Sequence, residues 1–193
     1  MHNLKDPIPL FEKWFDEELN RTKALIPTAV CLSTTGLDDF PNTRFVSYKE
    51  LVEGAFIITG PLNSRKGVEI QRNPKVALTF WWPQTQRQIR IQGVASMIPK
   101  DWALRYFEAR SMHSKAVSVV CNQGKVTHDL KSLEKKVLHT LTDTENLTMP
   151  ATWGGYAIQP IRMEFMEFKK NRFHDRKLFE LKENAWSVTQ IQP

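Results

Sequence analysis

Segments rich in β-forming residues lie at both ends of this chain, on either side of a helical middle. The early strands are predicted at Thr28–Thr35, Thr43–Leu51, Ala55–Thr59, Val76–Trp82 and Arg87–Met97. The late strands are predicted at Gly155–Gln159, Arg162–Phe168, Lys177–Leu181 and Ala185–Ile191. Early and late strands are expected to share one sheet, and this many antiparallel strands favour a closed barrel. The sequence therefore predicts one α+β, mainly β, domain over residues 1–193.

Three helical stretches are expected around this sheet. Apolar residues recur at helical spacing through Leu10–Leu19, and Ser64–Arg72 forms a short helix that Asn73-Pro74 stops. The region Asp101–Leu141 is mostly helical, with a break near Asn122–Gly124, and Thr142–Pro150 is a polar loop.

The residue usage excludes several classes of protein. The apolar runs are too short to cross a bilayer, and the N-terminus has no apolar leader, so we expect a cytoplasmic protein without a membrane segment. Cys31 and Cys121 belong to no CxxC pair, and no histidine pairs at ligand spacing, so neither a disulfide scaffold nor a metal site is expected. No glycine turn of the Rossmann type follows a strand.

The net charge of +6 points to an anionic partner, but no concentrated basic run supports nucleic-acid binding. Ser64-Arg65-Lys66-Gly67 opens a helix, where free N–H groups and two cations suit a phosphate, although a solvent-facing helix start explains the same pattern. Arg44 and Lys49, five residues apart on one strand, are expected on opposite faces. They could serve two ligands or lie as edge charges.

Two further groups carry phosphate-binding side chains. Tyr106, Arg110 and Ser114 are spaced i, i+4, i+8 and would line one stripe of a continuous helix, which is equally the pattern of an ordinary amphipathic edge. If the segment Asn171–Arg176 is extended, Arg172, His174 and Arg176 share a face; otherwise it is a charged hairpin end.

Taken in order, these stretches resemble the pyridoxamine 5′-phosphate oxidase family over nearly the whole chain. The stretches that carry the resemblance are Leu10-Phe11-x-x-Trp14, Arg44–Lys49, Ser64-Arg65-Lys66-Gly67, Asn73-Pro74, Arg87-Gln88, Tyr106-Phe107-x-x-Arg110, Trp153-Gly154-Gly155-Tyr156 and Glu164-Phe165 through Arg172-x-His174-Asp175-Arg176. The resemblance implies an FMN-binding split β-barrel with peripheral helices, forming a homodimer with FMN between the subunits. It also implies oxidation of pyridoxamine or pyridoxine 5′-phosphate by O2.

The resemblance also implies roles for single residues. The cofactor-binding positions would be Arg44, Phe45, Val46, Lys49, Ile58, Thr59, Arg65, Lys66, Gln88, Gln123, Gly124, Met166 and Arg176. The substrate-binding positions would be Lys49, Tyr106, Arg110, Ser114, Arg172 and His174, of which Arg172 and His174 would also be catalytic.

The chain departs from the family pattern mainly on the flavin side. Ile58 replaces a usual aromatic residue, Gly124 replaces serine in a Gln-Ser pair, and Met166 replaces tryptophan in Glu-Phe-Trp. The loop before Ser64 is one residue longer, and we expect almost no basic arm before the first helix. These changes keep two alternatives open: a related flavin oxidase acting on another ring, such as a phenazine, or a non-catalytic protein that binds FMN or pyridoxal phosphate.

Overall fold

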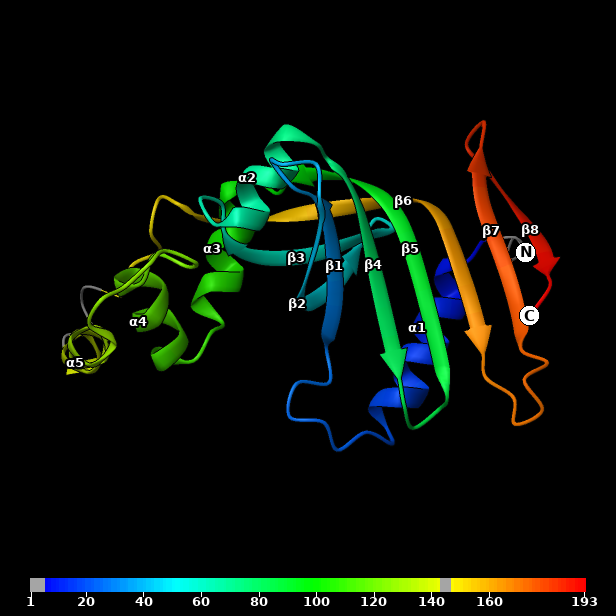
Figure 1. Cartoon of the computed structure of the whole chain (residues 1–193), viewed down its shortest axis with the longest axis horizontal. Coiled ribbons are helices and arrows are strands. Elements are labelled where there is room, and N and C mark those ends of the chain that lie inside the picture. The colour runs from blue at the N-terminus through cyan, green and yellow to red at the C-terminus, as the bar shows by residue number, and fades with distance from the viewer. Residues whose placement is uncertain (1–5, 143–146) are drawn as a thin grey trace.

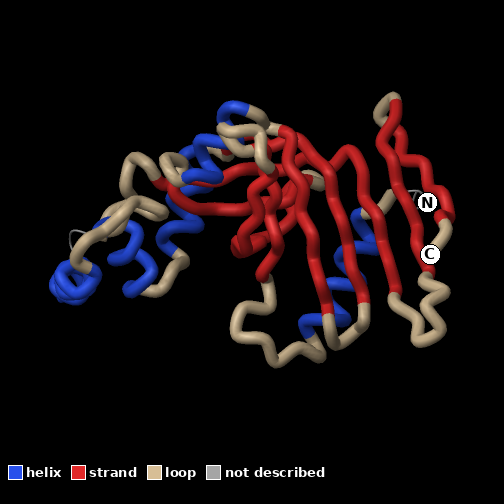
Figure 2. Tube along the Cα trace, viewed as in Figure 1, coloured by secondary structure: helices blue, strands red, loops and turns tan. Residues whose placement is uncertain are grey.

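One eight-stranded antiparallel sheet contains strands from both ends of the chain, as the sequence predicts. The structure is a computed structural model that describes residues 6–142 and 147–193, so part of the predicted loop Thr142–Pro150 lies outside the described residues. The strands are β1 (Ala29–Thr35), β2 (Pro41–Val52), β3 (Ala55–Pro61), β4 (Lys75–Trp82), β5 (Arg87–Met97), β6 (Trp153–Glu167), β7 (Asp175–Lys182) and β8 (Ala185–Ile191). Their order is β3-β2-β1-β4-β5-β6-β7-β8, and an additional β3–β6 pairing closes the first six into a barrel (Figures 1 and 2).

Strand β6 is the point at which the barrel splits. Its first half pairs with β3 through Trp153–Ile158, and its second half pairs with β7 through Arg162–Glu167. The expectation of two separate strands here is wrong, because Pro160 does not end the strand. The register shift between Gln92 and Gly93 leaves one extra residue on β6 beside Pro160. Such a bulge bends the strand and accommodates a proline that cannot donate to the ladder.

The barrel core follows the period-2 pattern of the strands. Ile89 and Ile91 of β5 are fully buried while Arg90 and Gln92 face outward. Helix α1 (Ile8–Leu19) adds Phe11, also fully buried, whose ring lies 4.8 Å from that of Phe56. The helix therefore packs aromatic side chains against the barrel core.

The remaining helices differ from the prediction in one respect that affects the site. They are α2 (Arg65–Arg72), α3 (Lys100–Glu108), α4 (Met112–Val120) and α5 (Leu130–Thr142). The break near Asn122–Gly124 is confirmed, but a second break separates α3 from α4. The Ser111 hydroxyl accepts a hydrogen bond from the Ser114 N–H and thereby caps a new helix.

The molecule is elongated, with helices at one end and the terminal strands at the other. Helices α4 and α5 lie beyond α3 at one end of the long axis, and the β7–β8 ribbon lies at the opposite end (Figure 1). Among the helices of the described residues, none has the length and apolar character that crossing a bilayer requires.

Candidate functional site

A cavity of about 550 Å³ lies between β2, β3, the start of α2 and helix α4. Of the predicted site residues, it is lined by Arg44, Phe45, Val46, Lys49, Thr59, Arg65, Lys66, Arg110, Gln123 and Gly124. Arg44 and Lys49, which were expected on opposite faces of one strand, line the same cavity. Phe45 is 75% exposed, so a large apolar ring surface is available to a ligand or to another subunit.

The cavity contains cations without a matching carboxylate. Lys49, Lys66 and Arg110 form no salt bridge with any described residue. Lys66 Nζ instead donates to Ser64 Oγ at 3.0 Å and to Gln123 Oε1 at 2.5 Å. Burial and the Arg44 charge lower the pKa of Lys66 to about 8, while burial and the Arg110 charge lower that of Lys49. An anion bound in this cavity would offset the repulsion between these neighbouring positive charges.

Several buried donors at the cavity also have no hydrogen-bond partner among the described residues. They are Thr59 Oγ1, Arg110 Nε and Trp153 Nε1, and all three residues line the cavity. Arg110 lies over the Trp153 ring at 5.5 Å, and its terminal nitrogen makes only long bonds to Ser114 O and Ser118 Oγ. Because buried polar groups are normally paired, these atoms fit a bound ligand with acceptor oxygens, such as a phosphorylated flavin.

The loop before α2 is held close to the first turn of that helix. A Cβ atom on Gly67 would lie 2.1 Å from the Leu62 carbonyl oxygen, so only glycine permits this approach. The Ser64 hydroxyl does not cap α2; it donates to the Pro61 carbonyl oxygen at 2.6 Å. These contacts hold the first turn of α2, which carries Arg65 and Lys66. These are the two cations that the sequence assigns to a phosphate.

The predicted stripe of Tyr106, Arg110 and Ser114 does not exist as one helical face. Tyr106 lies on α3, Arg110 follows the end of that helix, and Ser114 lies on α4, so the expectation of a continuous helix is wrong. Arg110 lines the cavity, whereas the Tyr106 hydroxyl donates to Glu50 Oε1. Of the three residues, only Arg110 lines the cavity.

A second group of predicted residues lies on the outward face of the sheet. Gln88 on β5, Met166 on β6 and Arg176 on β7 are direct cross-strand neighbours. Arg176 donates to Glu164 Oε1 through Nε at 3.0 Å and through its terminal nitrogen at 2.7 Å. None of the three lines the cavity.

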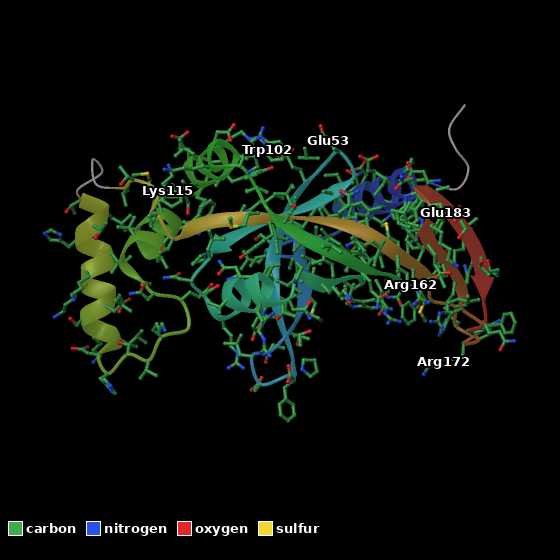
Figure 3. All side chains as sticks on the ribbon, turned by 90° about the horizontal axis from the view of Figure 1, so that it is seen from above. Glu53, Trp102, Lys115, Arg162, Arg172 and Glu183 are labelled. Atoms are coloured by element: carbon green, nitrogen blue, oxygen red, sulfur yellow. The ribbon has the colours of Figure 1, made fainter. Side chains whose placement is uncertain are left out.

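The loop between β6 and β7 carries Arg172 and His174. Of the two alternatives, the structure has the hairpin end and not the extended segment, because Arg172 adopts a left-handed conformation with φ of 67° and His174 Nδ1 accepts from the Lys169 N–H at 3.0 Å. Figure 3 shows Arg172 toward the opposite end of the molecule from Lys115 of α4. One protomer therefore does not bring the two groups of predicted residues together.

Some positions differ from, or were missed by, the sequence prediction. Ile58 is 2% exposed in the barrel core and does not line the cavity. Trp153, Ser118 and Cys121 line the cavity without having been predicted. Glu69 was also missed, although its i, i+4 spacing from Arg65 indicates an ion pair on α2.

Comparison with known proteins agrees with this fold. Residues 16–142 match the family described as pyridoxamine 5′-phosphate oxidase, and residues 153–193 match the pyridoxine 5′-phosphate oxidase C-terminal dimerisation region. A pyridoxine/pyridoxamine 5′-phosphate oxidase of Leptospira biflexa is 37% identical over 97% of this chain and 89% of its own length. One from Haemophilus influenzae is 36% identical over 98% and 90%.

Two solved structures are also similar. PhzG from Burkholderia lata 383, in complex with tetrahydrophenazine-1-carboxylic acid, has a TM-score of 0.93 and 26% identity, covering 100% of this chain and 95% of that one. A pyridoxamine 5′-phosphate oxidase-related, FMN-binding protein of Nostoc punctiforme has a TM-score of 0.79 and 16% identity, covering 95% and 97%. The likeness to the second structure concerns the fold alone.

The closed six-stranded barrel with its protruding β7–β8 ribbon defines a split β-barrel protein. Within this class, the match over residues 16–142 and the full-length relatives show that the chain belongs to the pyridoxamine 5′-phosphate oxidase family.

Proposed function

We propose that the protein is an FMN-dependent oxidase that converts pyridoxamine or pyridoxine 5′-phosphate to pyridoxal 5′-phosphate. The observation that carries the proposal is the cavity with three cations, Lys49, Lys66 and Arg110, that form no salt bridge with a described residue. Arg65 and Lys66 would hold the FMN phosphate, and Lys49 and Arg110 would hold the substrate phosphate. Tyr106 and Ser114 would assist only after Tyr106 leaves Glu50.

The site would be completed by a second copy of the chain. Gln88, Met166 and Arg176 lie away from the cavity, and residues 153–193 match a dimerisation region. In a two-fold dimer, every contact between two different patches occurs twice, once in each direction. The outward sheet face of each subunit can therefore cover the cavity of the other. Arg172 and His174 would then approach the substrate from the partner.

When bound, FMN would supply the redox chemistry for a two-electron oxidation at C4′ of the substrate, with O2 as the final acceptor and H2O2 as the product. The protein would supply orientation and charge. Arg172 would orient the pyridine ring and stabilise developing charge, and His174 would help to position it. Oxidation of the amine substrate would give an imine at C4′. Water would then hydrolyse this imine to the aldehyde and ammonia.

A visible spectrum tests this proposal directly. Purified protein, or protein incubated with FMN and desalted, is expected to show flavin absorption bands. Adding pyridoxamine phosphate without O2 is expected to bleach these bands, and admitting O2 is expected to restore them with formation of H2O2. Protein that stays colourless after incubation with FMN contradicts the cofactor, and bands that never bleach favour a binding protein without turnover.

Arg110→Ala tests the substrate-phosphate role. The variant is expected to raise KM for pyridoxamine phosphate roughly 10- to 100-fold, because a charge-assisted contact worth about 1.5–3 kcal/mol is lost. Steady-state kinetics at saturating FMN measure the effect. Arg21→Ala, which removes an exposed arginine of the segment after α1, is the matched control and is expected to leave KM unchanged. An unchanged KM in Arg110→Ala would remove Arg110 from the site.

A second candidate is oxidation of a different ring by the same barrel. Two observations favour it: the similarity to the PhzG structure and the presence of Met166 where the family usually has tryptophan. Parallel assays with pyridoxine phosphate and tetrahydrophenazine-1-carboxylic acid distinguish the candidates. The cation-rich cavity favours the phosphorylated substrate, because a dianion offsets more positive charge than a carboxylate does.

A further inference from the structure

A fully buried carboxylate lies beneath the rim of the cavity. Glu69 on α2 has 0% exposure and does not itself line the cavity. Its Oε2 accepts from Thr34 Oγ1 at 2.6 Å and from an Arg44 terminal nitrogen at 3.0 Å. Its Oε1 accepts from Asn42 Nδ2 at 2.6 Å and from Arg65 Nε at 2.9 Å. Both of its oxygens are therefore fully engaged by donors.

These contacts join β1 to two elements that line the cavity, β2 and α2. Thr34 belongs to β1, Asn42 and Arg44 to β2, and Arg65 to α2. Burial alone would raise the pKa of Glu69, but the hydrogen bonds from Thr34 and its neighbours outweigh burial and hold the pKa below its ordinary value. The side chain is thus a fixed anion at neutral pH.

Two of the four donors come from arginines that line the cavity. Arg44 also donates to Thr34 Oγ1, so its guanidinium is held at two points. Arg65 is held through Nε, and its terminal nitrogen makes only longer contacts with the exposed Asp38 at 3.4 Å and 3.5 Å. One carboxylate therefore fixes both guanidinium groups beside the uncompensated Lys66.

We propose that Glu69 is a positioning residue that fixes Arg44 and Arg65 for recognition of the phosphate group of the flavin nucleotide. This inference rests on the proposed function, since it assumes that FMN occupies the cavity. It goes further by assigning the phosphate selectivity of the site to a residue that does not line the cavity. The arginines then need not be ordered when the phosphate binds, which lowers the entropic cost of binding.

The opposite outcome is physically possible, which makes the inference testable. Glu69 is an anion close to the cavity, and removing its charge increases the positive potential felt by a phosphate. If charge alone matters, Glu69→Gln binds FMN more tightly. If position matters, Glu69→Gln binds FMN more weakly, because the amide NH2 presents donors to groups that are themselves donors.

The experiment compares FMN with riboflavin, which lacks the phosphate. Dissociation constants are measured by flavin fluorescence for the wild-type protein and for Glu69→Gln, and unfolding temperatures are measured without ligand. We expect Glu69→Gln to weaken FMN binding roughly 10- to 100-fold, the loss of one or two charge-assisted contacts. Riboflavin binding is expected to change less than about threefold, because the ring contacts are unaffected.

Glu18→Gln is the matched control. Glu18 is 2% exposed on α1 and accepts hydrogen bonds from the N–H groups of Gln84 and Thr85, away from the cavity. The Glu18→Gln variant is expected to have a lower unfolding temperature but an unchanged ratio of FMN to riboflavin affinity. A purely structural role for Glu69 predicts the same behaviour for Glu69→Gln.

The outcomes separate this inference from the proposed function. Wild-type protein that binds neither flavin contradicts the proposed function and this inference together. Wild-type protein that prefers FMN, with a Glu69→Gln variant that keeps or strengthens this preference, overturns the inference alone. A selective loss of FMN affinity in Glu69→Gln supports it.

Discussion

Co-expression of Lys66→Ala and Arg176→Ala subunits is expected to restore about a quarter of wild-type activity, although each variant alone is nearly inactive. Lys66 lines the cavity, whereas Arg176 lies on the outward face of β7. In the proposed dimer each site uses Lys66 of one subunit and Arg176 of the other. A mixed dimer therefore has one site with both residues intact and one site with neither.

The expected fraction follows from random pairing. About half of the dimers are mixed, and one of the two sites in each mixed dimer is intact. Differently tagged subunits allow the mixed dimer to be isolated and assayed with saturating FMN. Lys66→Ala co-expressed with Arg110→Ala is the matched control, because both residues line the same cavity and no site is restored. Equal activity in the two mixtures would rule out a site shared between subunits.

Phe11→Ala is expected to lower the free energy of unfolding by about 3–5 kcal/mol. The Phe11 side chain is fully buried, and its ring lies 4.8 Å from Phe56 and 5.2 Å from Phe80. Its removal leaves a cavity between α1 and the barrel that rigid strands cannot close. Urea denaturation at one protein concentration, in the absence of flavin, measures the loss.

Phe40→Ala provides the comparison for this loss. Phe40 is 72% exposed in the connection between β1 and β2, so its removal is expected to change stability by less than about 0.5 kcal/mol. A Phe11→Ala loss no larger than that of Phe40→Ala would mean that α1 does not contribute to the barrel core.

Most of the fold could be predicted from local sequence patterns. The predicted strand Arg87–Met97 is β5 with the same bounds, and the residues from Ser64 to Asn73 marked a short helix. Two features of the fold were predicted wrongly. The sequence around Pro160 reads as the end of a strand, because the bulge that accommodates it depends on the partner strand β5. The break before α4 depends on one side-chain bond from Ser111.

The sequence indicated which residues belong to the candidate cavity only in part, and it did not indicate their arrangement. Arg65 and Lys66 were assigned to one phosphate and Lys49 and Arg110 to another, whereas all four line one cavity. The sequence could not show that Gln88, Met166 and Arg176 lie away from the cavity. Their distance from the cavity within one protomer depends on how the sheet closes. Glu69 was missed because its role depends on contacts from β1 and β2.

The continuity of β6 has a consequence for how the two sites are built. Trp153 at the start of this strand lines the cavity, and Met166 near its end lies beside Gln88 and Arg176. In the proposed dimer the two ends of one hydrogen-bonded strand would therefore touch different flavins. Each β6 strand of that dimer would thus contribute residues to both pockets on one continuous hydrogen-bonded backbone.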